Sequence, residues 1–577
     1  MGTRPPSKIP WPISSFPGAT PQESSGRLVN CYAEPLGDPQ KPTGPAGQVW
    51  RRAPGMSLFA QSQGLSGYRG GLIVNNLAYE AWAGQMTTVT SAGVVTLRGA
   101  ANSFSGTKKI SIARNQASSP DVIAVDPDNG AFLLTSSGVP SAPTSFNGGG
   151  NLPQPNSICF QDGYFFFTIG NCQVFATALN STTVNALTFI TAQSKSDVTL
   201  LRGIPFSGLL FLFTTGGLEV WQDAGNAAPN FPYNRLVILP YGLIQGAAIA
   251  GFETGFDDLM WVAQDLGVYR LQWGSLQPQK ISPPDLDRLI EKQVNAGGLL
   301  EASVYMFAGQ KRWVLSCPGG TWEFNLNTQR WNERMSLNQA TGQFTRWRAT
   351  GGHPAFGKWL MGDTQSGNLL YLDDTNYTEN GAVQLFRMES GPVNDFPDQI
   401  RIARADFDFV MGQGIVQGNI LMSVQGAAAG NNGVVRLTVN NTAQVNTGDI
   451  GVISGIVGTT EANGTFPLTV IDATHVEIPV QFQNAYTSGG TVVDQTATPN
   501  QINPQAAISL SKDGGSTYSN PRVRAVGQQG KVKRQRASVK NMGQSGAIGD
   551  RWRVDVSDPV YVALLGATQS SDPREWG

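Results

Sequence analysis

Histidine and cysteine are scarce in this chain. Its 577 residues include 2 histidines, His353 and His475, and 4 cysteines, Cys31, Cys159, Cys172 and Cys317. So few histidines leave little material for a Ser-His-Asp triad or a histidine-rich metal centre. The cysteines show no C-x-x-C spacing, which argues against a zinc or redox site and favours structural thiols. We therefore expect no enzyme activity, no metal and no cofactor.

Charge and long apolar runs are also in short supply. Charged residues make up 14% of the chain, against roughly 25% in typical soluble proteins. The formal net charge is −1, which excludes binding of nucleic acid by overall electrostatic attraction, because tight phosphate binding needs many uncompensated cations. The N-terminus lacks the apolar core of a signal peptide, and no run of about 20 apolar residues could span a bilayer. We expect no membrane anchor and synthesis in the cytoplasm.

What the chain has in abundance is turn residues between short apolar strands: 68 glycines and 35 prolines. From Gly64 to Asp374, paired strands recur about every 35–55 residues around turns such as Asn129-Gly130 and Gly216-Gly217. Such a repeat of strand pairs is typical of propeller blades. The sequence therefore predicts an all-β fold in which residues 56–398 form a β-propeller of about six to seven blades.

The propeller region carries most of the tryptophans and one helix signal. Because large aromatic side chains bury the most area, we assign to the core Trp82, Trp221, Trp261, Trp273, Trp313, Trp322, Trp331, Trp347 and Trp359. A helix is predicted at Pro284–Asn295, with Ser282 as its N-cap and Gly297 as its stop. Its apolar face should pack against the propeller.

Three further regions flank or interrupt the C-terminal half. Residues 1–55 are proline-rich and predict an extended N-terminal arm, whereas residues 399–424 and 497–577 predict a C-terminal β-module. Residues 425–496 have a turn at almost every eighth position and predict a small inserted β-domain. We expect strand Asn419–Val424 to pair with Ala507–Leu510 beside that insert.

The C-terminal module contains a hairpin turn followed by a run of cations. Asp513-Gly514-Gly515 supplies the residues that a tight turn needs. The cations fall largely on alternate positions, so that several should share one face of a sheet: Arg522, Arg524, Lys531, Lys533, Arg534, Arg536 and Lys540. They are either a solvated strand face or a contact with nucleic acid or an acidic partner.

Several segments together resemble one known family. They are RLVNCYAEP and RRAPG in the arm, FSGLLFLFTTGGLEVWQ and ISPPDLDRLIEK in the propeller, and SKDGGSTYSNPRVRAVGQQGKVKRQR with DRWRVDVSDPVYVALLGA near the end. This combination resembles the tail hub, also called nozzle or packaged-DNA-stabilisation protein, of short-tailed bacteriophages. The resemblance covers most of residues 20–424 and 500–568, and leaves out the insert.

The resemblance implies a structural role in the virion tail. Family members form a homohexameric ring below the tail adaptor, which implies as partners other copies of the chain, the adaptor, tail fibre, spike or needle proteins, and the double-stranded DNA that passes through. The arm would then dock on a neighbour or the adaptor through Arg27, Asn30, Tyr32, Trp50, Arg51 and Arg52. The cations Arg522, Arg524, Lys531, Lys533, Arg534 and Arg536 would line the DNA channel or a subunit interface.

Two other functions fit parts of the sequence. A glycan-binding propeller, as in a receptor-binding or depolymerase-like tail protein, could use exposed aromatics such as Trp347 or Tyr377 as stacking platforms. A sialidase is disfavoured, because the one good Asp-box-like turn, at Asp513, lies outside the propeller and such turns normally recur once per blade. The glycan-binding propeller therefore stands as the alternative.

Overall fold

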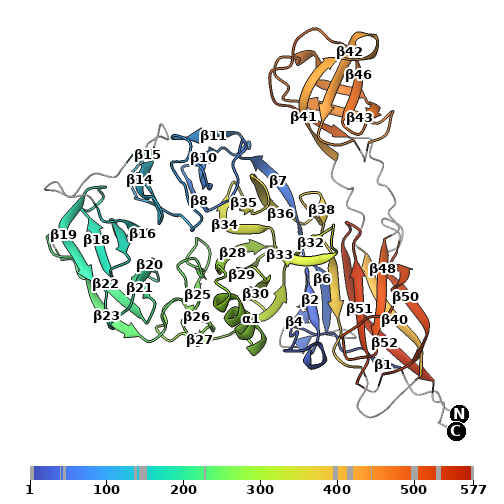
Figure 1. Cartoon of the computed structure of the whole chain (residues 1–577), viewed down its shortest axis with the longest axis horizontal. Helices are drawn as coiled ribbons and strands as arrows, with labels where there is room; N and C mark the ends of the chain where they lie inside the picture. Colours follow the sequence, from blue (N-terminus) through green and yellow to red (C-terminus); the bar gives the residue numbers. More distant parts are fainter. Residues whose placement is uncertain are drawn as a thin grey trace.

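The computed structural model describes residues 6–38, 41–42, 47–134, 140–141, 152–226, 229–393, 401–411, 420–442, 445–494, 504–527, 534–546 and 548–572. Their regular elements are strands, apart from helix α1 (Pro284–Asn295) and three 3-10 turns, η1 (Pro21–Glu23), η2 (Asn431–Gly433) and η3 (Thr460–Ala462). The predicted all-β class is confirmed. Figure 1 shows a propeller, a β-sandwich beside it, and a separate small β-module.

The propeller has seven antiparallel blades within the described residues, in agreement with the predicted six to seven. Blade 1 is β8 (Gly70–Val74), β9 (Leu77–Ala81), β10 (Met86–Val89) and β11 (Val95–Arg98), and blade 2 is β12 (Ser111–Arg114), β13 (Val122–Asp126), β14 (Gly130–Leu134) and β15 (Pro140–Ser141). Blade 3 is β16 (Pro155–Gln161), β17 (Tyr164–Ile169), β18 (Gln173–Thr177) and β19 (Val184–Thr191), and blade 4 is β20 (Leu200–Phe206), β21 (Leu209–Thr214), β22 (Leu218–Asp223) and β23 (Tyr233–Leu239). Blade 5 is β24 (Ile249–Ala250), β25 (Asp258–Val262), β26 (Val268–Gln272) and β27 (Gln279–Lys280). Blade 6 is β28 (Glu301–Phe307), β29 (Gln310–Cys317), β30 (Gly320–Asn325) and β31 (Arg330–Glu333).

The seventh blade closes the circle with a strand from the N-terminal part of the chain. It consists of β34 (Ala349–Ala355), β35 (Lys358–Asp363), β36 (Asn368–Asp373) and β7 (Gly55–Gln61). The strand β7 pairs with β36 in the register Leu370↔Leu58, and β34 lies against β8 of the first blade. The circle of blades is therefore closed by the pairing of β36 with β7, two strands that lie far apart in the sequence.

The blades pack face to face, so their middle strands are apolar on both sides. In β21, for example, Leu210–Phe213 is buried without interruption. Eight of the nine tryptophans assigned to the core are buried. The prediction for Trp273 is wrong, because its side chain is 61% exposed. It lies in the turn after β26, where its ring meets the edge of Phe206 at 5.4 Å between centroids. Trp273 is exposed because it lies in a turn, where an apolar side chain is not enclosed by neighbouring strands.

Blade 6 does not end at its fourth strand but continues into the sandwich. The full sheet has nine strands, in which β31 is followed by β2 (Arg27–Val29), β39 (Phe386–Glu389), β51 (Arg551–Val556), β48 (Gln505–Ser511) and β49 (Arg522–Ala525). The three-residue strand β2 pairs with β31 on one side and with β39 on the other. A piece of the arm thus joins the propeller to the sandwich.

The second sheet of the sandwich also mixes arm and C-terminal strands. Its order is β3 (Cys31–Pro35), β6 (Gln48–Arg52), β52 (Val562–Asp572), β40 (Arg401–Met411) and β50 (Arg534–Gln544), with β1 (Ser7–Lys8) paired to β52. Between the sheets lies an apolar core that includes Leu28, Phe407 and Trp552. The arm, predicted as an extended layer over other elements, instead contributes strands to both sheets.

The small β-module has its own core and its own strands. These are β41 (Ile420–Ala429), β42 (Val434–Val439), β43 (Ile450–Ser454), β44 (Gly464–Pro467), β45 (Thr469–Asp472), β46 (His475–Gln481) and β47 (Thr491–Asp494). The predicted pairing of Asn419–Val424 with Ala507–Leu510 is wrong. Strand β41 pairs with β47, as in Ser423↔Thr491, while β48 pairs with β49 and β51. The strand expected to precede the insert is its first strand.

Helix α1 has the predicted bounds but a different N-cap. The N-cap is Pro283, whose φ of −73° and ψ of 156° are extended, and Ser282 makes no cap hydrogen bond. The Ser282 hydroxyl instead accepts from the Val268 amide (3.0 Å) and donates to Asp287. Leu286 and Ile290 are buried in the propeller core, so the predicted packing face is confirmed. None of the described helices is long and apolar enough to cross a membrane.

The remaining short strands are β4 (Gly37–Asp38) with β5 (Lys41–Pro42), the hairpin β32 (Met335–Asn338) and β33 (Gln343–Arg346), and β37 (Thr378–Glu379) with β38 (Ala382–Val383). The pair β37 and β38 extends blade 7, because Glu379 of β37 lies opposite Met56 of β7. All four cysteines are buried and free, as expected of structural thiols.

Candidate functional site

The predicted cations lie on two strands at one side of the sandwich. Strand β49 ends the nine-stranded sheet and β50 ends the other. The two strands meet there, because Arg524 Nε donates to the Ser538 carbonyl (2.8 Å) and Gln535 Nε2 to the Ala525 carbonyl (3.3 Å). We call this region the cationic edge; its described members are Arg522, Arg524, Arg534, Arg536 and Lys540, all exposed. Lys531 and Lys533 lie outside the described residues.

Their spacing predicted that several of the cations share one sheet face. The structure shows instead that they are divided between two sheets. Arg522 and Arg524 belong to one sheet, while Arg534, Arg536 and Lys540 alternate outward on the other, with Ala537 and Val539 buried between them. The expected alternation is present within each strand. The sequence could not show that a chain reversal between the strands assigns them to different sheets.

Carboxylates neutralise part of the cationic edge. Asp408 pairs with Arg534 at 3.0 Å (Oδ1 to Nε) and raises the pKa of that guanidinium. Among the described residues, no carboxylate lies within 4 Å of Arg522, Arg536 or Lys540. A small group of unneutralised cations can attract an anion locally, but it is too small for tight binding of duplex DNA.

The hairpin turn beside the cationic edge is held by Asp513. Its carboxylate accepts from the amide (2.9 Å) and hydroxyl (2.6 Å) of Thr517 and from the hydroxyl of Ser511 (2.7 Å). Desolvation opposes the charged form, yet these hydrogen bonds lower the pKa of Asp513 to about 2. Gly514 has a φ of +69°, which explains the glycine there.

The arm residues predicted to dock on another protein are engaged within the chain. Arg27 binds Glu333 through two bonds, Nε to Oε1 at 3.1 Å and Nη2 to Oε2 at 2.6 Å. The Asn30 amide donates to the carbonyls of Met335 (2.8 Å) and Leu385 (2.9 Å). These contacts connect the arm to blade 6 and to the segment before β39.

The other predicted arm residues behave similarly. Trp50 Nε1 donates to the Pro12 carbonyl (2.7 Å), and the ring of Tyr32 lies 4.2 Å from the Arg312 guanidinium carbon. Arg51 binds the Tyr561 hydroxyl (2.7 Å) and remains 37% exposed. Docking of the arm on a neighbour stays a prediction, and Arg51 is the residue best placed for it.

Arg52 is the most deeply buried of the arm cations. Its guanidinium donates to three backbone carbonyls, those of Val560 (3.0 Å), Asp558 and Gln384. Within the described part of the chain no carboxylate pairs with it, and burial lowers the pKa of Arg52 to about 10. One side chain thereby links the arm, the sandwich and the segment leading to β39.

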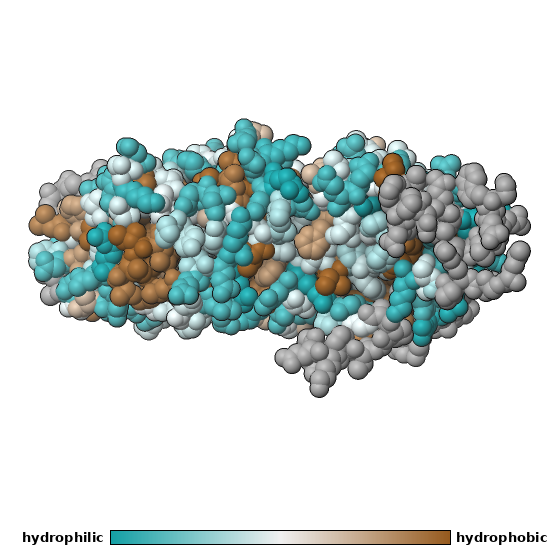
Figure 2. Space-filling model, turned by 90° about the horizontal axis from the view of Figure 1, so that it is seen from below, coloured by the Kyte–Doolittle hydropathy of each residue, from teal (hydrophilic) through white to brown (hydrophobic). Residues whose placement is uncertain are grey.

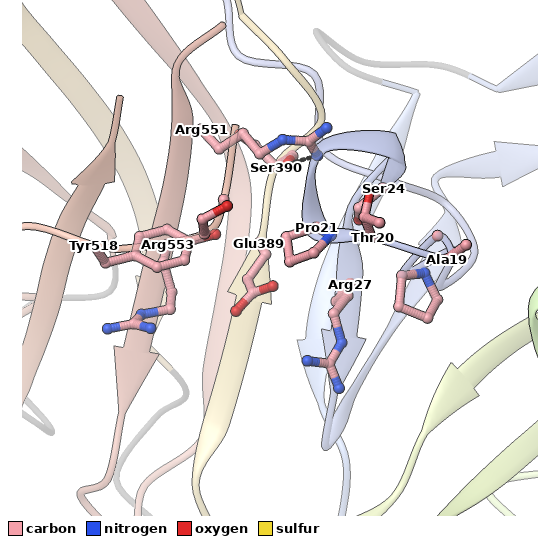
Figure 3. Close-up of a pocket in the computed structure, with 14 residues that line it drawn as sticks. Ala19, Thr20, Pro21, Ser24, Arg27, Glu389, Ser390, Tyr518, Arg551 and Arg553 are labelled. Atoms are coloured by element: carbon pink, nitrogen blue, oxygen red, sulfur yellow. Dashed lines mark hydrogen bonds between the residues drawn. The ribbon is translucent and has the colours of Figure 1, made fainter. Parts of the chain in front are cut away.

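A polar pocket of about 360 Å³ opens where the arm meets the sandwich. Figure 3 shows Glu389 between Arg27 on one side and Arg553 with Tyr518 on the other. Arg553 lies 4.1 Å from the Tyr518 ring, and Arg551 donates to the Gln22 carbonyl (2.9 Å). Burial, and secondarily the charge of Glu389, raise the pKa of Tyr518.

The lining of the pocket includes no histidine and no cysteine. The Ser390 hydroxyl is occupied, since it donates to the Gly391 carbonyl (2.8 Å) and accepts from the Trp552 amide (2.9 Å). No cluster of three His, Cys, Asp or Glu side chains suited to a metal occurs in the described residues. Sequence reasoning missed Arg551 and Arg553, although their alternation around Trp552 was a signal that two cations flank a buried indole.

The aromatics suggested as glycan platforms are not available on the surface. Trp347 is 1% exposed and Tyr377 is 7% exposed. The ring of Trp347 lies under the Arg334 guanidinium, 4.5 Å from its central carbon. Neither ring can stack on a sugar without a rearrangement of the core.

The fold and this surface together define a structural β-protein: a seven-bladed propeller joined to a sandwich, with a partly neutralised cationic edge. Residues 27–377 match the family described as bacteriophage P22 Gp10, β-propeller, and residues 481–569 match bacteriophage P22 Gp10, β-sandwich. The chain belongs to the bacteriophage P22 Gp10 family, which confirms the predicted resemblance to phage tail hub proteins. It is a structural protein of the phage tail.

Other comparisons add little. No curated protein matches the chain. The WD40 β-propeller domain of Doa1 shares 7% identity over 56% of this chain and 97% of its own, with a TM-score of 0.35. The computationally designed Ika8 protein shares 13% identity over 58% of this chain and 96% of its own, with a TM-score of 0.33. At these TM-scores neither likeness carries an argument.

Proposed function

We propose that the protein is a subunit of a homohexameric ring that extends the portal and adaptor channel of a short-tailed phage. The ring helps to retain packaged DNA and conducts it during ejection. The observation that carries this proposal is the match of both the propeller and the sandwich to one phage tail family within a single chain.

The charge of the chain supports a conduit. A channel for DNA must let the duplex pass without holding it, and a net charge of −1 with a small cationic edge fits that requirement. The cationic edge then faces either the DNA or an acidic surface of a neighbouring subunit. Arg51, which pairs with Glu34 but keeps 37% of its side chain exposed, contacts a neighbour or the adaptor. Tail fibre, spike or needle proteins attach to the finished ring.

The test is native mass spectrometry with negative-stain imaging of the purified protein, alone and mixed with the adaptor. A closed ring with a central hole, formed alone or on the adaptor, is the expected result. A monomer that ignores the adaptor contradicts the proposal. In that case a glycan array tests the alternative, a glycan-binding propeller, although the two aromatics predicted as its platforms, Trp347 and Tyr377, are buried.

The role of the cationic edge needs its own variants. Replacing Arg522, Arg524 and Arg536 by Gln should lower DNA retention by assembled tails or weaken the ring. Lys195→Gln, which removes an exposed cation of the propeller, is the matched control. Unchanged retention and unchanged assembly would make the edge a solvated surface.

A further inference from the structure

Two neighbouring blades expose apolar side chains along their outer strands. In blade 3, Leu187 and Phe189 of β19 are 72% and 39% exposed, and Leu179 in the turn before β19 is 61% exposed. In blade 4, Leu236 and Ile238 of β23 are 49% and 42% exposed. We call these five residues the apolar rim. Figure 2 shows a brown apolar area near the left end of the molecule, the end that blades 3 and 4 occupy in Figure 1.

The two strands belong to one surface. The Thr188 hydroxyl of β19 donates to the carbonyl of Pro229, in the segment that leads into β23 (3.2 Å). Each strand pairs on one side only within the described residues, as the last strand of its sheet. The apolar side chains therefore flank unpaired backbone groups, a combination that attracts another protein surface.

Blades 5, 6 and 7 protect the same position. The outer strand of blade 6 is covered by β2, and that of blade 7 by β37. Blade 5 ends in the exposed polar residues Gln279 and Lys280, which discourage pairing. Blades 3 and 4 have neither device: β19 has no charged residue, and the one cation of β23, Arg235, faces Glu219 at 3.6 Å. Nucleic acid is a poor occupant for so neutral a surface.

We propose that the apolar rim is the contact surface for a second copy of this chain, which meets it head to tail with a different part of its surface. The inference rests on the proposed ring and identifies one side of its subunit contact. The rim and the sandwich lie at opposite ends of the long axis in Figure 1, an asymmetry that suits heterologous contacts, which can close a ring.

The rim is large enough to form the centre of a subunit contact but not the whole of it. A strand of seven or eight residues is about 25 Å long, and stacked sheets are about 10 Å apart, so the rim covers only a few hundred Å². A stable interface between two proteins usually buries about 800 Å² on each partner. The rim can be the apolar centre of such an interface, and in a closed ring every copy makes two of these contacts.

The test compares the wild-type chain with the double variant Leu236→Asp, Ile238→Asp by native mass spectrometry and sedimentation velocity over a dilution series. Two carboxylates placed in an apolar contact should weaken association by roughly a hundredfold or more. The matched control is Leu97→Asp in β11, an exposed leucine (40%) on the outer strand of blade 1, which should assemble normally.

Each outcome bears on a different statement. A wild-type ring with a folded, monomeric double variant and a normal control supports the rim. A double variant that assembles like the wild type overturns the proposed role of the rim but does not contradict the proposed ring. A Leu97→Asp control that dissociates as much as the double variant has the same meaning. A wild type that stays monomeric, alone and with the adaptor, overturns both the ring and the rim.

A second measurement covers the case in which the double variant does not fold. A photo-crosslinking amino acid at position 187, in an otherwise wild-type chain, lies at the most exposed point of the rim. Crosslinks to a peptide of another copy outside the rim support the proposal. Crosslinks from rim to rim, or none in an assembled ring, overturn it.

Discussion

The outer strands of blades 6 and 7 pair with a further strand, whereas the outer strands of blades 3 and 4 do not within the described residues. Blades 6 and 7 are covered by β2 and by β37, which come from segments far away in the sequence or at the end of the propeller. Blades 3 and 4 leave apolar side chains in solvent. The difference shows that one fold can complete some edges by itself and leave others to be completed by assembly. Substitutions at the covered edges should therefore reduce stability, and substitutions at the bare edges should reduce association.

The largest loss of stability is expected from Arg52→Met. The substitution leaves three buried carbonyls, including that of Val560, without a donor, so we expect a loss of about 4 kcal/mol in the free energy of unfolding. Urea unfolding measures it. Lys195→Met, at an exposed cation of the propeller, is the control and should stay within about 0.5 kcal/mol. Equal losses for both variants would contradict the role of Arg52 as a buried link between the arm and the sandwich.

Glu379, in the strand that covers blade 7, should make stability depend on pH. Burial raises the pKa of Glu379 to about 7 from the usual 4.5. The folded protein then keeps a proton that the unfolded chain loses, so this contribution to stability is complete below about pH 4.5 and is lost as the pH rises through 7. The loss amounts to about 3 kcal/mol.

Glu379→Gln should remove that dependence. The variant should be more stable than the wild type at pH 8 and should lose the excess as the pH falls to 4.5, as followed by thermal unfolding at several pH values. Glu291→Gln, a substitution of an exposed carboxylate on helix α1, is the control and should leave the pH dependence unchanged. If the stabilities of the wild type and of Glu379→Gln changed with pH in parallel, the raised pKa of Glu379 would be contradicted.

A smaller effect is expected at the turn that ends the nine-stranded sheet. Asp513→Ala removes the hydrogen bonds to Thr517 and should cost about 1 kcal/mol. Because the pKa of Asp513 is about 2, below the usual 3.8, its contribution is present above about pH 4 and is lost as the pH falls through 2. Asp513→Asn keeps one acceptor and should lose less. Equal losses for both variants would exclude the hydrogen-bond explanation.

The smallest change in stability is expected at the cationic edge. Arg522→Gln and Arg536→Gln affect exposed side chains, so the free energy of unfolding should change by less than about 0.5 kcal/mol. Their effect should appear in the salt dependence of DNA retention or of ring assembly. A large loss of stability instead would mean that these cations hold the two sheets together.

Local features of the fold could be predicted from the sequence, and long-range pairings could not. The blade hairpins follow from turn residues between apolar strands, and α1 follows from its prolines and its apolar face. By contrast, nothing near Leu28 in the sequence indicates that β2 lies between β31 and β39. The incorrect pairing of Asn419–Val424 has the same origin, because strand β41 suits either sheet by its own residues.

The candidate site was predictable to a similar degree. The cations of β49 and β50 were identifiable as residues, since an exposed strand with alternating arginines is unusual. Their distribution over two sheets, and the neutralisation of Arg534 by Asp408, depend on β40, more than 100 positions earlier in the chain. The apolar rim gave no sequence signal, because exposed and buried leucines look alike until the order of strands is known.

The position of β2 also has a consequence for the biosynthesis of the protein. Residues Arg27–Val29 leave the ribosome early, yet their strand partners are Arg330–Glu333 and Phe386–Glu389. At about 5–20 residues per second, roughly 300 further residues take about 15–60 s to synthesise. During that interval Leu28, fully buried in the finished protein, lacks both of the strands that pair with β2. The segment that joins the propeller to the sandwich is thus made before both of them, but can pair only after both of its partner strands have been made.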